Sequence, residues 1–112
     1  MEVKAREMRA LALDNSAPFR EWYNSIKDKR AKAAIHNRLY RASAGNFGDH
    51  KFFRGVGEMR IDVGPGYRVY FAIHNDMIIV LLGGGDKSSQ DKDIDKAVNL
   101  WEKHHGDINR FR

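Results

Sequence analysis

The sequence predicts a small α+β domain: a helical hairpin, a set of antiparallel strands and a C-terminal helix. Three observations lead to this fold class. Apolar residues recur at helical spacing in the first half of the chain, alternate with polar residues in residues 56–73, and return to helical spacing after residue 88. At 112 residues, we expect residues 1–112 to form one domain with one core.

The composition excludes several classes of protein. The chain has no cysteine, which excludes disulfides, thiolate metal sites and a cysteine nucleophile and suits a reducing compartment. The charged N-terminus lacks an apolar signal core, and the longest apolar run, MIIVLL, is too short to span a bilayer. We therefore expect a cytoplasmic protein without a membrane partner.

The N-terminal half should form a strand followed by two helices. Residues 2–12 fit a strand and a short helix about equally well, and a strand is favoured. The first helix should begin near Ser16, with Asn15 or Ser16 as its cap and Pro18 in its first turn. The second helix, residues 30–44, should end at Gly45. Its apolar stripe is Ala31, Ala34, Ile35, Leu39 and Ala42.

Basic residues surround the second helix, and two interpretations of them stay open. A solvated surface is favoured over an RNA-binding face. The residues concerned are Lys27, Lys29, Arg30, Lys32, Arg38 and Arg41. Residues 45–57 hold four of the ten glycines and predict a long connection that exposes Lys51 and Arg54.

Two strands should follow, at residues 56–63 and 67–73. If Val63 pairs with Tyr67 around Gly64, Pro65 and Gly66, then Asp62 faces Arg68 and Arg60 faces Tyr70. Asn75 and Asp76 should then turn the chain into a third strand covered on both faces. In that register Arg68 lies opposite Gly83, and Lys87 emerges beside Arg68 just after the strand.

The chain should close with a helix and a frayed tail. Ser88 or Ser89 is the predicted cap, with Asp91 and Asp93 in the first turn. Its apolar stripe is Ile94, Ala97, Val98 and Trp101. Residues 104–112 are expected to fray.

These placements bring Arg60, Arg68 and Lys87 to one polar patch of the sheet, edged by Glu58, Asp62 and Tyr70. A guanidinium held by a sheet is a rigid, planar fork of donors that suits phosphate oxygens. The alternative is an Asp62–Arg68 ion pair with no further role. The formal net charge of +5 favours polyanionic partners.

The motifs of common enzyme classes are missing, so any activity should need neither metal nor cofactor. The histidines are scattered, and no serine-hydrolase motif or phosphate-binding loop occurs. RNA cleavage fits this restriction, because the substrate supplies the ribose 2′-hydroxyl as its own nucleophile. Arg68 and Lys87 would neutralise the phosphorane. Glu58, Asp91 or a lysine with a lowered pKa would act as general acid and base.

Three blocks of the chain carry a resemblance to a known family. They are FREWYNSIKDKRAKAAIHNRL, GNFGDHKFFRGVGEMRIDVGPGYRVYF and LLGGGDKSSQDKDIDKAVNLW. Residues 17–101 resemble the HigB-type addiction-module killer proteins of the RelE/ParE toxin superfamily. The resemblance implies a helical hairpin packed on a curved, mainly antiparallel sheet. It also implies a toxin that cleaves messenger RNA on the ribosome until a paired antitoxin, a helix-turn-helix protein, neutralises it.

The resemblance assigns roles to three residues of this chain: Arg68, the arginine of the GYR block, Lys87 after the last strand, and Arg60 on the preceding strand. The chain departs from the wider superfamily at Glu58, where relatives carry a lysine, and at Asp93, where some carry a tyrosine. Contacts with RNA and the ribosome are expected from exposed basic residues: Lys29, Arg30, Lys51 and Arg54.

Two other functions stay open. A sister branch of the same superfamily inhibits DNA gyrase and cuts no RNA. The third interpretation is a binding module without catalytic activity, whose basic face docks an acidic protein.

Overall fold

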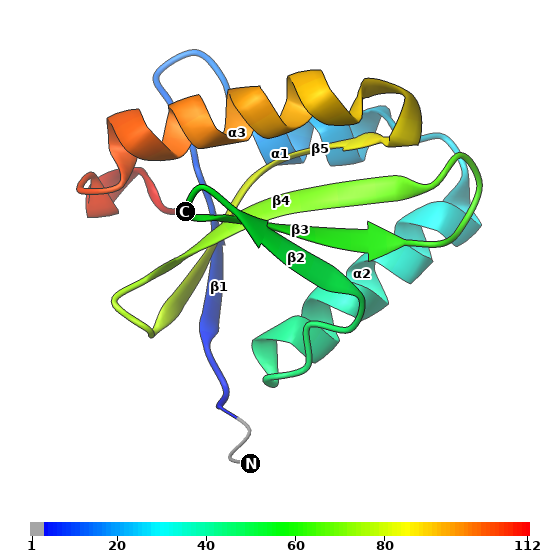
Figure 1. The fold of residues 1–112 in the computed structure, drawn as a ribbon, viewed down its shortest axis with the longest axis horizontal. Coiled ribbons are helices and arrows are strands. Elements are labelled where there is room, and N and C mark those ends of the chain that lie inside the picture. Colours follow the sequence, from blue (N-terminus) through cyan, green and yellow to red (C-terminus); the bar gives the residue numbers. More distant parts are fainter. Residues whose placement is uncertain (1–3) are drawn as a thin grey trace.

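A computed structural model describes residues 4–112 and confirms the predicted fold class, a single α+β domain with two helices, a five-stranded sheet and a C-terminal helix (Figure 1). No helix in these residues is long and apolar enough to cross a membrane. Two short 3-10 turns follow β5 and α3, namely η1 (Lys87–Ser89) and η2 (Ile108–Arg110). The strands and helices are β1 (Glu7–Ala10), α1 (Pro18–Ser25), α2 (Lys29–Ser43), β2 (His50–Phe53), β3 (Val56–Ile61), β4 (Tyr67–His74), β5 (Ile78–Asp86) and α3 (Gln90–His104).

The sheet has the strand order β1-β5-β4-β3-β2. All neighbouring strands are antiparallel except β1, which runs parallel to β5. The strand favoured within residues 2–12 is therefore confirmed, while residues 2 and 3 lie outside the described part of the chain. Pairing of β1 with β5 ends where Ala10 lies opposite Leu81, so within residues 4–112 no strand pairs with the outer side of the C-terminal half of β5.

Helices cover both faces of the sheet, and the core has two parts. Met59, Val69 and Phe71 pack beneath α1 and α2, together with Ile35 and Leu39 of α2. On the opposite face, a second cluster packs beneath α3; it contains Tyr70, Ala72, Val80, Leu82, Ala97 and Val98. The alternation predicted for β3 and β4 is confirmed, but the face predicted as polar carries half of the core.

The helix ends differ in detail from the sequence-based prediction. The N-cap of α1 is Ala17, whose amide donates to Glu21 Oε2 (2.7 Å), so the caps predicted at Asn15 and Ser16 are wrong. Asp28 caps α2, and Gly45, with φ of 106°, follows its end. Ser89 stands at the N-cap of α3 as predicted, but its hydroxyl makes no capping bond.

The predicted register between β3 and β4 is wrong by two residues. Ile61, not Val63, pairs with Tyr67, and residues 62–66 form the connection. Val63 N donates to Ile61 O (2.9 Å), so the chain leaves the ladder before Val63. The shift is even, and each side chain therefore keeps its predicted face. Asp62 lies in the connection, exposed, instead of opposite Arg68.

The register between β4 and β5 is also displaced by two residues, for two separate reasons. The turn holds three residues, 75–77, because Met77 N donates to His74 O (3.0 Å) and His74 pairs with Ile78. A β-bulge then inserts one extra residue of β5 opposite the Tyr70/Phe71 step. Arg68 consequently lies opposite Gly85, not Gly83.

Two segments expected to be irregular are ordered. The connection predicted for residues 45–57 contains β2, which pairs with β3 along its whole length. The tail predicted to fray returns to the sheet: Arg112 N donates to Ala10 O (2.8 Å), and Phe111 is buried with its ring stacked on Trp101. The apolar side chain of Phe111 belongs to the core beneath α3, which explains why this segment is held.

Asp76, in the turn between β4 and β5, should give the protein an acid-sensitive contact. Its carboxylate binds Lys4 Nζ (2.6 Å) and Arg6 Nη2 (2.7 Å), and these bonds lower the pKa of Asp76 to about 2. A lowered pKa stabilises the fold above the ordinary carboxyl pKa and ceases to do so as pH falls through about 2. We expect Asp76→Asn to lower the unfolding midpoint in urea at pH 6, with the difference vanishing near pH 2. An equal difference at both pH values would contradict this assignment.

Candidate functional site

Two arginines lie directly opposite each other on neighbouring strands, at the end of the sheet where α3 begins. Arg60 of β3 pairs with Arg68 of β4, which in turn pairs with Gly85 of β5. Like charges directly opposite each other on a sheet repel and destabilise it. The row therefore concentrates positive charge at a cost in stability.

Each guanidinium is bonded through one of its two Nη atoms and leaves the other Nη atom free within residues 4–112. The Nε atoms of Arg60 and Arg68 are both buried, and neither has a hydrogen-bond partner within residues 4–112. Arg60 Nη2 contacts Asp49 Oδ1 (2.9 Å), and Arg68 Nη1 donates to Gly66 O (3.1 Å). No carboxylate of the described chain lies within ion-pair distance of Arg68. Arg60 Nη1 and Arg68 Nη2 are neither buried nor bonded there, so they are available to a ligand.

Lys87 lies beside this pair, as the sequence predicts. It is the first residue of η1 and is exposed. A Cβ placed on Gly66 would lie 3.4 Å from Arg68 Nη1 and 3.6 Å from Lys87 Cβ, so both residues flank the same glycine. The three predicted cations therefore gather at one end of the sheet. We call Arg60, Arg68 and Lys87 the cationic patch.

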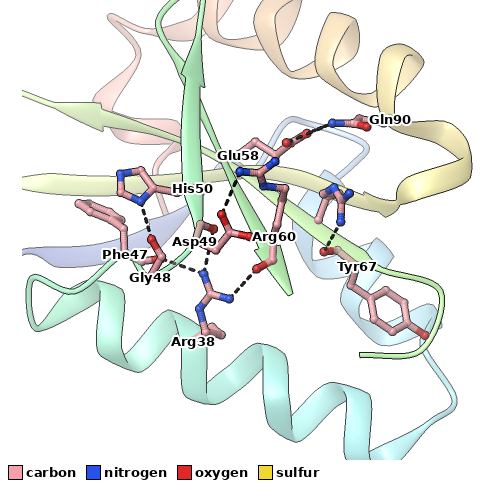
Figure 2. Close-up of polar contacts among 10 residues, drawn as sticks. Arg38, Phe47, Gly48, Asp49, His50, Glu58, Arg60, Tyr67 and Gln90 are labelled. Carbon is pink, nitrogen blue, oxygen red and sulfur yellow. Dashed lines mark hydrogen bonds and ion pairs between the residues drawn. The ribbon is translucent and has the colours of Figure 1, made fainter. Parts of the chain in front are cut away.

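Glu58, a predicted acid or base, lies next to the patch but is sealed from solvent. It is the one polar residue in the buried set of the described chain, with 0% of its surface exposed. Gln90 Nε2 donates to both of its carboxylate oxygens (3.0 and 3.2 Å; Figure 2). Tyr70, opposite Glu58, has a buried hydroxyl, and burial together with the charge of Glu58 raises the pKa of Tyr70.

Asp93 brings a second carboxylate to the row of the two arginines. A Cβ on Gly85 would lie only 1.8 Å from Asp93 Oδ2, so the carboxylate occupies the space that the glycine leaves open. Ser89 Oγ donates to the same oxygen (2.5 Å). Asp91, the other predicted acid or base, is exposed on α3 and makes no hydrogen bond to the patch in the described chain. The sequence placed Asp93 only in the first turn of the last helix, and its position over Gly85 follows from the observed register.

Arg38 is a positioning residue that the sequence prediction assigned to the exposed surface of α2. Figure 2 shows its guanidinium turned toward the segment before β2. It donates to Arg60 O (2.6 Å), Phe47 O (2.8 Å) and Asp49 O (3.1 Å). Burial, followed by repulsion from Arg41, lowers the pKa of Arg38. Arg38 thus ties the segment that carries Asp49 to the strand that carries Arg60.

The four residues predicted to contact RNA or the ribosome do not form one surface. Lys51 of β2 is exposed and lies opposite Glu58, on the face of the patch. Arg54 pairs with Asp95 of α3 (2.5 Å). Lys29 and Arg30 are exposed in the first turn of α2, the helix that covers the other face of the sheet. Only Lys51 shares the face of the cationic patch and lies free of an ion pair in residues 4–112.

Comparison with known proteins adds one relative. No protein-family model matches the chain, and no solved structure matches it. A protein of Haemophilus influenzae, described as an uncharacterized protein, is 47% identical over 94 residues, which cover 83% of this chain and 95% of the relative. The chain therefore belongs to the same family as this Haemophilus influenzae protein.

Proposed function

We propose that the protein is the toxin of a type II toxin–antitoxin pair, a metal-independent endoribonuclease that cleaves messenger RNA on the ribosome. The observation that carries the proposal is the direct pairing of Arg60 with Arg68 next to Lys87, with one Nη atom of each arginine free of a hydrogen bond within residues 4–112. A phosphodiester bound between the two guanidiniums would relieve their repulsion. The resemblance of residues 17–101 to HigB-type killer proteins supports the same function, in the cytoplasm, where ribosomes are.

The chemistry follows from where charge develops in RNA cleavage. The ribose 2′-oxygen attacks the adjacent phosphorus, a phosphorane forms, and the bond to the 5′-oxygen breaks, leaving a 2′,3′-cyclic phosphate and a 5′-hydroxyl. Arg60 and Arg68 stabilise the extra charge on the phosphorane oxygens. The Asp93 carboxylate takes the proton from the 2′-hydroxyl, and the Lys87 ammonium supplies a proton to the departing oxygen.

The proposed activity is tested on a translated message. The purified protein is added to ribosomes translating one message, and the 5′ ends of the RNA are mapped for the wild type, Lys87→Ala and Lys103→Ala. Cuts inside the reading frame that disappear in Lys87→Ala and persist in Lys103→Ala, an exposed lysine of α3, would support the proposal. Uncut RNA together with gyrase-dependent DNA breaks would show the gyrase-inhibiting alternative instead.

An antitoxin should bind the cationic patch or hold the protein away from the ribosome. We propose an acidic surface on a helix-turn-helix protein, because the free Nη atoms and Lys87 are open to carboxylates as well as to phosphates. Co-expression should restore growth and yield a complex whose stability falls with salt. A rescue that persists without any complex would count against a binding antitoxin.

Gly85→Ala should remove activity by displacing Asp93. The new methyl group would overlap the Asp93 carboxylate, which must then leave the row of the arginines. We expect the cleavage rate to fall about 10²–10⁴-fold, the usual contribution of a general base. The rate is compared with that of Gly106→Ala, whose Cβ meets no atom within 4 Å. An active Gly85→Ala protein would remove Asp93 from the mechanism.

A further inference from the structure

A pocket of about 350 Å³ opens between α1 and α3, beside the cationic patch. Its walls come from Trp22 and Glu21 of α1 and from Asp93 and Lys96 of α3, and Gly83 and Gly84 of β5 lie at its floor. Figure 1 shows α3 and α1 on opposite sides of this end of β5. The volume is in the range of small-molecule sites.

Three features around residues 82–84 of β5 shape the pocket. The partner strand β1 pairs only as far as Leu81, so no strand in the described part of the chain pairs with the outer side of the backbone that follows. A Cβ on Gly83 would meet no atom within 4 Å, so this glycine lies beside empty space. At Gly84, by contrast, the Trp22 ring approaches to 2.2 Å of the Cβ position, which fixes the indole as a wall of the pocket.

The pocket and the cationic patch are connected through neighbouring residues of β5. Gly83 and Gly85 are two residues apart on β5, about 7 Å along a strand, and Gly85 is the residue opposite Arg68. Asp93 lines the pocket and also covers Gly85. A nucleotide with its phosphate on Arg60 and Arg68 therefore has space for its base over Gly83, with its ribose next to Asp93.

We propose that this pocket binds a guanine base of the RNA substrate, an inference that rests on the proposed ribonuclease function. The exposed Glu21 carboxylate, whose Oε2 also accepts from Ala17 N (2.7 Å), can accept bonds from the adjacent N1–H and N2–H₂ donors of guanine. The Lys96 ammonium can donate to its O6. Adenine and uracil lack two adjacent donors on one edge. A basic side chain of a protein partner would be repelled by Lys96, which favours the base as occupant.

Direct binding tests this proposal without reference to cleavage. Trp101→Phe leaves Trp22 as the single tryptophan, whose fluorescence is followed during titration with GMP, AMP or ribose 5-phosphate. GMP should give a saturable change at least about tenfold tighter than AMP, and ribose 5-phosphate should give none. Gly83→Leu, which fills the pocket, should weaken GMP binding at least tenfold, and Gly106→Leu should leave it unchanged. Equal binding of all three ligands, or no effect of Gly83→Leu, would overturn the proposal.

Cleavage mapping separates this inference from the proposed function. If the wild type cuts RNA next to guanine and Glu21→Gln cuts RNA without that preference, both are supported. If the wild type cuts RNA and neither Glu21→Gln nor Gly83→Leu changes the cut sites, the pocket is not a base site while the function stands. If GMP binds in the pocket and RNA stays uncut, the ribonuclease function fails and the guanine site remains.

Discussion

Arg68→Ala is expected to lower the rate of RNA cleavage at least about 100-fold without destabilising the protein. The loss follows because removal of one donor to a developing oxyanion costs about 10²–10³ in rate. Stability should hold or rise, because Arg68 makes no ion pair in the described chain and lies opposite Arg60. Single-turnover cleavage and urea unfolding measure the two effects.

The control for this prediction is Arg9→Ala, which removes a strand arginine that pairs with Glu7 (2.9 Å) outside the patch. It should retain cleavage and lose no more than about 1 kcal/mol of stability. Arg68→Lys keeps the charge but loses the planar fork, so it should recover only part of the rate. Full activity of Arg68→Ala, or a large loss of stability, would show that Arg68 is a structural residue.

Glu58→Ala should have the largest effect on stability, about 3 kcal/mol in the free energy of unfolding. The carboxylate is fully buried, and its removal leaves the Gln90 amide at the start of α3 without this partner and opens a cavity beside Tyr70. The substitution also removes a negative charge two residues from Arg60 on β3. The guanidiniums of Arg60 and Arg68 would then remain at the end of the sheet with less negative charge nearby. Chemical denaturation of the variant measures the loss.

Two variants show whether the loss comes from burial of the charge. Glu102→Ala removes an exposed carboxylate of α3 and should change stability by less than about 0.5 kcal/mol. Glu58→Gln keeps the volume and one acceptor, so it should lose less than Glu58→Ala. If Glu58→Ala is as stable as Glu102→Ala, Glu58 does not anchor the start of α3.

The faces of the strands were predictable from the sequence, but their registers were not. Period-two alternation places Met59 and Val69 on one side whatever the turn does, because the register error between β3 and β4 is even. The turn at residues 62–66 tightens through local backbone bonds, and the bulge near Leu82 adds one residue. Neither the tightened turn nor the bulge changes the pattern of apolar and polar residues, so neither could be predicted from it.

The candidate site was predictable in its cations and not in its carboxylates. Arg60, Arg68 and Lys87 stand beside glycine-rich turns, and the sequence therefore indicates an open cationic patch. The burial of Glu58 depends on Gln90, the first residue of α3, which lies 32 positions later in the chain. The sequence around Glu58 does not indicate that a side chain from a distant helix covers its carboxylate. The role of Arg38 could not be predicted either, because its partners are backbone carbonyls, which every residue carries whatever its side chain.

Nuclear magnetic resonance of the arginine Nε–H groups tests the central claim most directly. The Nε atoms of Arg60 and Arg68 are buried, which slows exchange of their protons with water and makes them observable. Titration with a short RNA that carries a 2′-deoxy nucleotide at the cleavage site blocks the reaction and leaves binding. We predict that the Nε–H signals of Arg60 and Arg68 shift together with one dissociation constant, and that the Nε–H signal of Arg9 does not shift. Binding that shifts neither signal, or only one of them, would contradict a shared phosphate site.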